Sequence, residues 1–341
     1  MSKVVYLMGA GASYGTRAKN VWAITSGIPV VNEIPGELGR WARDVALFDW
    51  SDHASYRPQD SSFEVDLIEA QKRLSTDLTW LAEESAKHAT IDTFAKKLYL
   101  TKDYTNYNRL KRALSSFFLI EQVEHKSDMR YDAFLANILT EGCQIPDDIT
   151  ILTWNYDSQF EIALRTYLPH LANLQISPIC LSSYDSFELK VRYKIFKING
   201  SATFSDEKPI SRFCTADEQK FSEKSIRREV LWYYGNGNLQ SNLSFAWDNS
   251  VTDYFYYTIA KEVKDAMTLV VIGYTFPYFN RATDRKLFSM MGNLRNIIIQ
   301  DPNADAIVQN VQSVFPDYNT MKGISFQPEK YVESFIIPRE L

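Results

Sequence analysis

Cysteine is scarce in this chain of 341 residues, which contains only Cys143, Cys180 and Cys214. The three cysteines lie far apart, and no C-x-x-C pair occurs. The chain therefore cannot build a zinc ribbon from paired cysteines or a dense disulfide framework. A sparse, odd number of cysteines is typical of a protein that works in a reducing cytoplasm.

Long apolar runs and excess positive charge are also missing. The apolar run Val4–Met8 is too short for the core of a signal peptide, and no segment approaches the ~20 apolar residues that span a bilayer. The net charge of −5 gives no overall attraction to nucleic acid. We therefore expect a cytoplasmic protein without a membrane segment. The hydrophobic content of 45% and charged content of 23% predict an ordered globular fold.

Short apolar runs rich in β-branched residues recur along the chain and predict buried strands. Helical patterns separate several of these runs, which predicts a parallel sheet covered on both faces. The fold class that we expect is α/β, with a Rossmann-like, doubly wound parallel sheet and no zinc module. The predicted strands lie at residues 4–8, 149–154, 193–200, 268–276 and 296–303, with a last candidate near Gly323.

Two stretches interrupt this alternation. Residues 37–141 carry apolar residues at spacings of three and four, which predicts a mainly helical insertion with Thr90 and Asp92 as candidate cap residues. Residues 205–250 are polar and aromatic, with a turn signal at residues 235–237, and predict a second insertion. We expect one domain over residues 1–341 that carries both insertions.

Ligands of a doubly wound sheet bind outside the carboxyl ends of its strands. The residues that follow the apolar runs are mostly small or carry amide, hydroxyl or carboxylate groups. This set suits a dinucleotide better than a metal, because no histidine cluster occurs. The residues are Gly9, Ala10, Gly11, Ala12 and Ser13; Asn155, Tyr156 and Asp157; Asn199, Gly200 and Ser201; Gly273, Tyr274 and Thr275; and Asp301, Pro302 and Asn303.

The segment GAGAS at residues 9–13 has the residue types of a phosphate-binding turn. Gly9 permits a tight turn, Gly11 lets the backbone approach a pyrophosphate, and N–H groups at the start of a following helix would hold its negative charge. The G-x-G-x-x-G pattern is incomplete because the third glycine is Gly15, so a simple glycine-rich turn is an equal alternative. Asp157 also has an alternative role, as a cap of the predicted helix that follows it.

Five motifs follow one another in a fixed order: GAGAS (9–13), GIP (27–29), TWNYD (153–157), KINGS (197–201) and VIGYTF (271–276). This ordered set resembles the sirtuin superfamily, and more closely the divergent bacterial sirtuin-like domains of anti-phage defence NAD hydrolases. The resemblance spans residues 4–309 and is patchy in the helical stretch. It implies a Rossmann-type site that binds NAD as a substrate and uses no metal.

The resemblance also implies roles for single residues. Asn155 would hold the attacking water or the ribose face at the anomeric carbon, and Asp157 would hydrogen-bond the nicotinamide carboxamide. Pro29 would lie by the nicotinamide end. The remaining expected NAD contacts are Gly9, Ala10, Gly11, Ala12 and Ser13 at the phosphates and ribose, Gly273 and Thr275 with Tyr274 at the adenosine half, Asp301 or Asn303 at the adenine ribose, and Gly200.

Two departures from the family pattern shape the expected function. The deacylases of the superfamily carry a zinc module with two cysteine pairs, which this chain cannot build, so the resemblance favours NAD hydrolysis. The motif that corresponds to KINGS normally has a histidine where this chain has Asn199. Asparagine forms hydrogen bonds but cannot accept a proton near neutral pH. The alternative is therefore a catalytically silent module that binds NAD or ADP-ribose in assembly or sensing.

The expected function is hydrolysis of NAD to nicotinamide and ADP-ribose by a defence effector that depletes NAD. Regulation would come from homo-oligomer assembly or from a partner such as an ATPase. A nucleic-acid-binding reading rests only on the basic and aromatic stretch Lys96–Arg112. A solvated helix face is the favoured interpretation of that stretch, given the acidic total charge.

Overall fold

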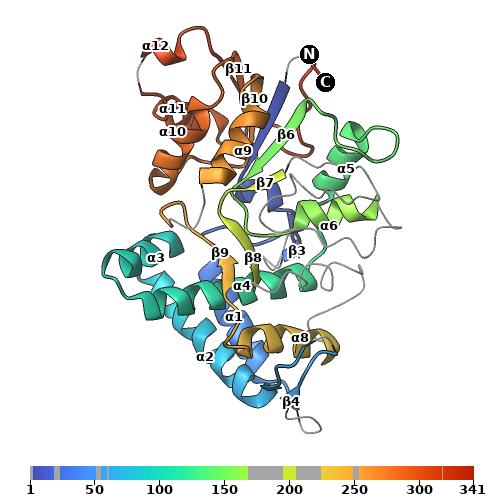
Figure 1. Cartoon of the computed structure of the whole chain (residues 1–341), viewed down its shortest axis with the longest axis vertical. Coiled ribbons are helices and arrows are strands. Elements are labelled where there is room, and N and C mark those ends of the chain that lie inside the picture. The colour runs from blue at the N-terminus through green and yellow to red at the C-terminus, as the bar shows by residue number, and fades with distance from the viewer. Residues whose placement is uncertain are drawn as a thin grey trace.

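The computed structural model describes residues 3–18, 24–50, 55–59, 61–167, 195–204, 224–248, 253–316 and 318–341. A sheet of six parallel strands forms its upper half in Figure 1, and a layer of helices forms the lower half. Cys180, Cys214, residues 193–194 and part of the predicted second insertion, residues 205–223 and 249–250, lie outside the described residues. The sheet comprises β1 (Lys3–Met8), β6 (Ile149–Thr153), β7 (Ile195–Lys197), β10 (Ala266–Ile272), β11 (Asn296–Gln300) and β12 (Ser325–Glu329).

The strand order confirms the predicted doubly wound α/β fold. The strands lie side by side as β12-β11-β10-β1-β6-β7, and every neighbouring pair is parallel. When the six strands are numbered by their order in the chain, their arrangement in the sheet is that of a Rossmann fold. In this fold successive strands are added on one side of the first strand and then on its other side. The reversal here falls between β1 and β10.

Helices cover both faces of the sheet. Successive side chains of β1 point to opposite faces, so their contacts show which helices pack on each face. Val5 and Leu7 pack in one apolar cluster with side chains of α9, α10 and α11, whereas Val4, Tyr6 and Met8 pack in another with α5 and α6. The helices are α5 (Met129–Ile138), α6 (Gln159–Thr166), α9 (Asp253–Val263), α10 (Arg281–Ser289), α11 (Ala304–Gln312) and the short α12 (Tyr318–Met321).

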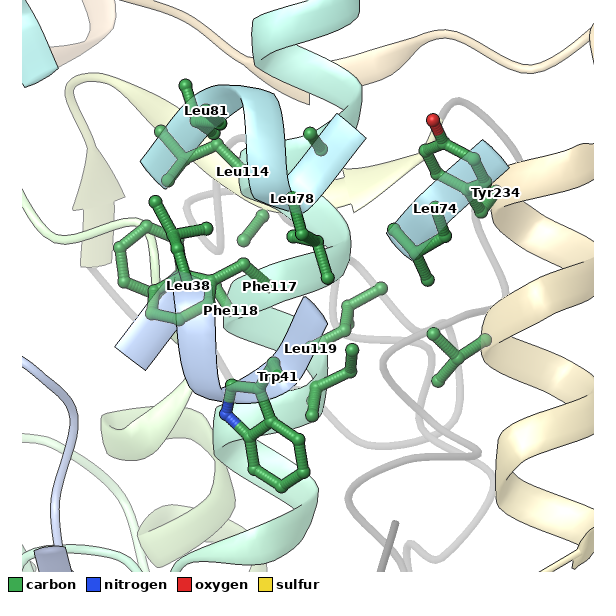
Figure 2. Close-up of a cluster of buried hydrophobic side chains, with 14 of the residues drawn as sticks. Leu38, Trp41, Leu74, Leu78, Leu81, Leu114, Phe117, Phe118, Leu119 and Tyr234 are labelled. Carbon is green, nitrogen blue, oxygen red and sulfur yellow. The ribbon is translucent and has the colours of Figure 1, made fainter. Parts of the chain in front are cut away.

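The helical layer lies beyond the carboxyl ends of the central strands (Figure 1). It contains α1 (Ile34–Ala46), α2 (Leu67–Ala86), α3 (Ile91–Leu100), α4 (Tyr104–Glu124) and α8 (Lys224–Gly235). Figure 2 shows its core, where Leu38 and Trp41 of α1, Leu78 of α2 and Phe117 of α4 converge. The predicted cap Thr90 is confirmed, because its hydroxyl accepts the N–H of Thr93 at 3.1 Å.

Short antiparallel pairs complete the described secondary structure. The predicted strand at residues 193–200 divides in two: β7 belongs to the main sheet, whereas β8 pairs with β9 beside the helical layer. The short strands are β2 (Thr16–Arg17), β3 (Ile24–Ser26), β4 (Ser55–Tyr56), β5 (Val65–Asp66), β8 (Gly200–Phe204) and β9 (Ser241–Leu243), and the 3₁₀ helices are η1 (Ala10–Ser13) and η4 (Tyr278–Asn280).

Candidate functional site

The loop after β1 meets the loop after β10 at the reversal of strand order, where doubly wound folds bind ligands. The N–H of Gly9 donates to the carbonyl of Ile272 at 2.9 Å, and the N–H of Gly11 donates to the carbonyl of Gly273 at 3.0 Å. A Cβ on Gly273, whose φ is +59°, would lie 2.4 Å from the Cα of Gly11. The close approach that Gly11 permits in this structure is therefore to the backbone of β10.

A single turn of 3₁₀ helix follows β1, in place of the regular helix expected after the glycines. The first α-helix begins at Ile34 instead. Two hydrogen bonds fix the end of this loop. The carbonyl of Ser13 accepts the N–H of Ile28 at 2.7 Å, and the carboxylate of Asp128 accepts the N–H of Gly15 at 2.8 Å. These bonds place the GIP segment directly against GAGAS, with Pro29 buried.

Asn155 connects the ends of β1 and β6. Its side chain is 8% exposed, and its amide nitrogen donates to the carbonyl of Gly9 at 2.9 Å and to the hydroxyl of Ser13 at 3.0 Å. The Ser13 hydroxyl in turn bonds the Tyr131 hydroxyl at 2.9 Å. Within the described chain, nothing donates to the amide oxygen of Asn155, so this oxygen is the atom that a water or a ribose hydroxyl can use.

Asp157 follows β6 beside Asn155, and the Ser13 hydroxyl is among the groups that stabilise its carboxylate. It is 6% exposed, and its carboxylate accepts the N–H of Gln159 at 3.0 Å, which is the capping contact weighed from the sequence. Burial raises the pKa of Asp157, and the ammonium of Lys197 opposes that rise. The contact with a nicotinamide carboxamide stays a prediction.

A small cavity adjoins Asn155 and Asp157, has a mainly apolar lining, and has room for about one water molecule. Lys197 and Glu161 also line it and form a buried ion pair at 3.0 Å, while the Lys197 ammonium donates to the carbonyl of Asp157 as well. Sequence reasoning missed this pair, although a lysine inside the apolar run YKIFKING was a signal for it. A buried charge requires a partner, and Glu161 supplies it.

Asn199 lies at the end of β7, with 7% of its surface exposed. Its amide nitrogen donates to the Tyr156 hydroxyl at 3.4 Å, and its amide oxygen is buried without a hydrogen-bond partner among the described residues. The next residue, Gly200, has φ +68°, and a Cβ there would lie 2.1 Å from the carbonyl oxygen of Asn242. Gly200 is therefore explained by packing against β9, and its contact with NAD stays a prediction.

The predicted adenosine contacts spread over the ends of β10 and β11. Tyr274 is buried, stacks on Trp154 with ring centroids 5.6 Å apart, and donates to the Asp284 carboxylate at 3.0 Å. Thr275 and Asn303 are exposed. Asp301 accepts the N–H of Asn303 at 2.8 Å. Gly273 thus lies against the loop after β1, whereas Asp301 and Asn303 follow β11, the next strand of the sheet.

Asp92 is a further candidate that the sequence marked only as a possible cap. It lies in the first turn of α3, is half-buried, and makes no hydrogen bond to any described residue. Burial raises its pKa to about 6. Its charge acts on the hydroxyls of Tyr156 and Tyr274, which follow β6 and β10. A half-buried carboxylate with a raised pKa and no described hydrogen-bond partner is a candidate functional group.

Three of the six cations in the basic stretch Lys96–Arg112, those on α4, have partners inside the fold. Arg109 pairs with Asp77 at 2.6 Å, Lys111 pairs with Asp248 at 3.2 Å, and Arg112 donates to main-chain carbonyls of α8 and the turn after it. These contacts favour a structural role for the stretch over nucleic-acid binding.

The part of the chain that the structure describes contains no group of three or more His, Cys, Asp or Glu side chains that could hold a metal ion. None of its helices is long and apolar enough to cross a membrane. No protein-family model matches the chain, and no curated protein matches it either. The case for a function therefore rests on the residues of this chain.

Proposed function

We propose that this chain binds NAD at the carboxyl edge of its sheet and hydrolyses the nicotinamide–ribose bond. The reaction consumes water and yields nicotinamide, ADP-ribose and a proton. The observation that carries the proposal is the amide of Asn155, anchored to Gly9 and Ser13 at the reversal of strand order with its oxygen left for a ligand. Doubly wound sheets bind dinucleotides at this point.

The chemistry suits a site made of hydrogen-bonding groups. The bond breaks through a ribose with cation-like character, so positioning, exclusion of bulk water and one oriented water supply most of the rate. The amide oxygen of Asn155 is an acceptor that orients a water or a ribose hydroxyl toward the anomeric carbon. The buried aromatic pair Trp154 and Tyr274 gives the site an apolar wall.

The biological setting that we propose is anti-phage defence in the cytoplasm, where the enzyme depletes NAD after a trigger. This part of the proposal rests on the resemblance of the five motifs to sirtuin-like defence domains. It carries with it regulation by homo-oligomer formation or by a partner ATPase. Cells that express the chain should lose NAD after phage infection, and cells that express Asn155→Ala should not.

One observation favours a second function. Asn199 occupies the family's histidine position, and a silent module that binds NAD or ADP-ribose needs no proton acceptor there. The decisive test incubates the purified full chain with NAD and quantifies free nicotinamide by chromatography. Calorimetric titration with ADP-ribose runs in parallel, and Asn137→Ala, at an exposed helical position, serves as the control for Asn155→Ala. Release of nicotinamide supports the hydrolase, whereas binding without release supports the silent module.

A further inference from the structure

Beside the proposed NAD site, Tyr156 packs against the apolar cluster that contains Ile91 and Phe94 of α3, the neighbours of Asp92. Asn199 at the end of β7 donates to the hydroxyl of Tyr156, which follows β6. The carboxylate of Asp92 in α3 acts electrostatically on that same hydroxyl and on the hydroxyl of Tyr274, which follows β10. Because β6 and β10 flank β1 on either side, the helical layer presents Asp92 to the carboxyl edge where the strand order reverses.

The cluster contains an acceptor that lacks a donor. The amide oxygen of Asn199 is buried and receives no hydrogen bond from the described residues. Leaving such an atom unsatisfied is destabilising, and a ligand hydroxyl or a water would remove that cost. Asp92 likewise has acceptor oxygens without a described donor. Asn199 bonds the Tyr156 hydroxyl and the charge of Asp92 acts on the same hydroxyl, so the two acceptors suit a group with two O–H bonds, such as water.

We propose that Asp92 is the general base of the NAD hydrolysis proposed above and accepts the proton that Asn199 cannot accept. As the bond from C1′ of the ribose to the nicotinamide nitrogen breaks, its electron pair leaves with nicotinamide. The oxygen of a water held by Asn199 forms the new bond to C1′. The Asp92 carboxylate takes one proton of that water and later releases it to solvent. This inference rests on the proposed function.

The surroundings of Asp92 suit this role. Burial raises its pKa to about 6, so the carboxylate is ionised at neutral pH yet more basic than an exposed aspartate. The groups that face it are the neutral phenols Tyr156 and Tyr274, with Tyr107 and Asp248 beyond Tyr156 and Lys96 one turn along α3. Activity that depends on the ionised carboxylate is lost as pH falls through about 6.

The test compares Asp92→Asn with a matched control, Asp103→Asn. Asp103 caps α4 in the same helical layer, and asparagine preserves a cap. Nicotinamide release is measured from pH 5 to 8 and ADP-ribose affinity by calorimetry. We expect Asp92→Asn to lose ~10²-fold or more in rate and its pH inflection, with unchanged ADP-ribose affinity. Asp103→Asn should keep the parent rate.

Rescue distinguishes a lost base from a disturbed fold. Adding Asn199→His to Asp92→Asn should restore turnover, with an inflection near the ~6.5 of imidazole. A parent-like rate in Asp92→Asn would overturn the role of Asp92 while leaving the proposed function intact. If the parent chain releases no nicotinamide, whether or not it binds ADP-ribose, the proposed hydrolysis fails, and the inference fails with it.

A carboxyl-carbon NMR titration of the parent chain covers the case in which Asp92→Asn does not fold. The Asp92 resonance should titrate near pH 6 and shift when ADP-ribose is added. A resonance that titrates near the ~3.9 of a free aspartate and ignores ADP-ribose would overturn the inference.

Discussion

Replacing Gly273 with alanine should unfold the site by separating the loops after β1 and β10. The new Cβ would lie 2.4 Å from the Cα of Gly11 and 2.6 Å from the nitrogen of Ala12, and both are backbone atoms that cannot rotate away. Overpacking of this kind costs ~1–3 kcal/mol. The φ of +59° at residue 273 adds ~1–2 kcal/mol for a residue with a Cβ. The expected loss in the free energy of unfolding is therefore ~2–5 kcal/mol.

Substitutions at two other glycines separate the cost of overpacking from the cost of a positive φ. Gly323 has φ +87° with no atom within 4 Å of its built Cβ, so Gly323→Ala should cost only the ~1–2 kcal/mol of backbone strain. Gly292 has open space and no positive φ, so Gly292→Ala should be neutral or stabilising by ~0.4–1 kcal/mol. Urea unfolding of the three variants gives the free energies. If Gly273→Ala costs no more than Gly323→Ala, the close approach of the two loops is refuted.

Three further substitutions test the site. Asn155→Ala should abolish nicotinamide release and lose ~0.5–1.5 kcal/mol in urea unfolding, because the Gly9 carbonyl keeps the Ala12 N–H but loses the second of its two donors; a parent-like rate would contradict the role of Asn155. Asp284 is fully buried with a pKa raised to about 8, so the folded parent should lose stability as pH rises from ~4 to about 8. In Asp284→Asn the melting temperature should fall less over this pH range. A variant whose melting temperature changes with pH just as that of the parent does would refute the raised pKa. Lys197→Met should cost ~3–5 kcal/mol by leaving Glu161 buried without its cation. Adding Glu161→Leu should recover part of that loss, and a fully additive double variant would exclude coupling.

The strands and helices around the sheet could be predicted because their signals are local. β-branched runs such as Val4–Met8 and Ile149–Thr153 form strands buried on both faces, and amphipathic spacing marks the helices between them. Asn155 and Gly273 could be predicted as candidate site residues because they follow predicted strands, and parallel strands end at one edge of the sheet. The strand order was not readable from these local patterns.

Contacts between distant segments decided the roles of the site residues. Gly11 faces Gly273, Lys197 pairs with Glu161, and the charge of Asp92, on a helix far away in sequence, acts on Tyr156 after β6. Desolvation and pairing depend on which atoms surround a side chain in space, and a single sequence carries no direct record of that environment. The sequence by itself therefore determined the parallel sheet and the edge at which the candidate site was expected, whereas the tertiary structure decided which of the carboxylates near that edge are capped, paired or left without a described partner.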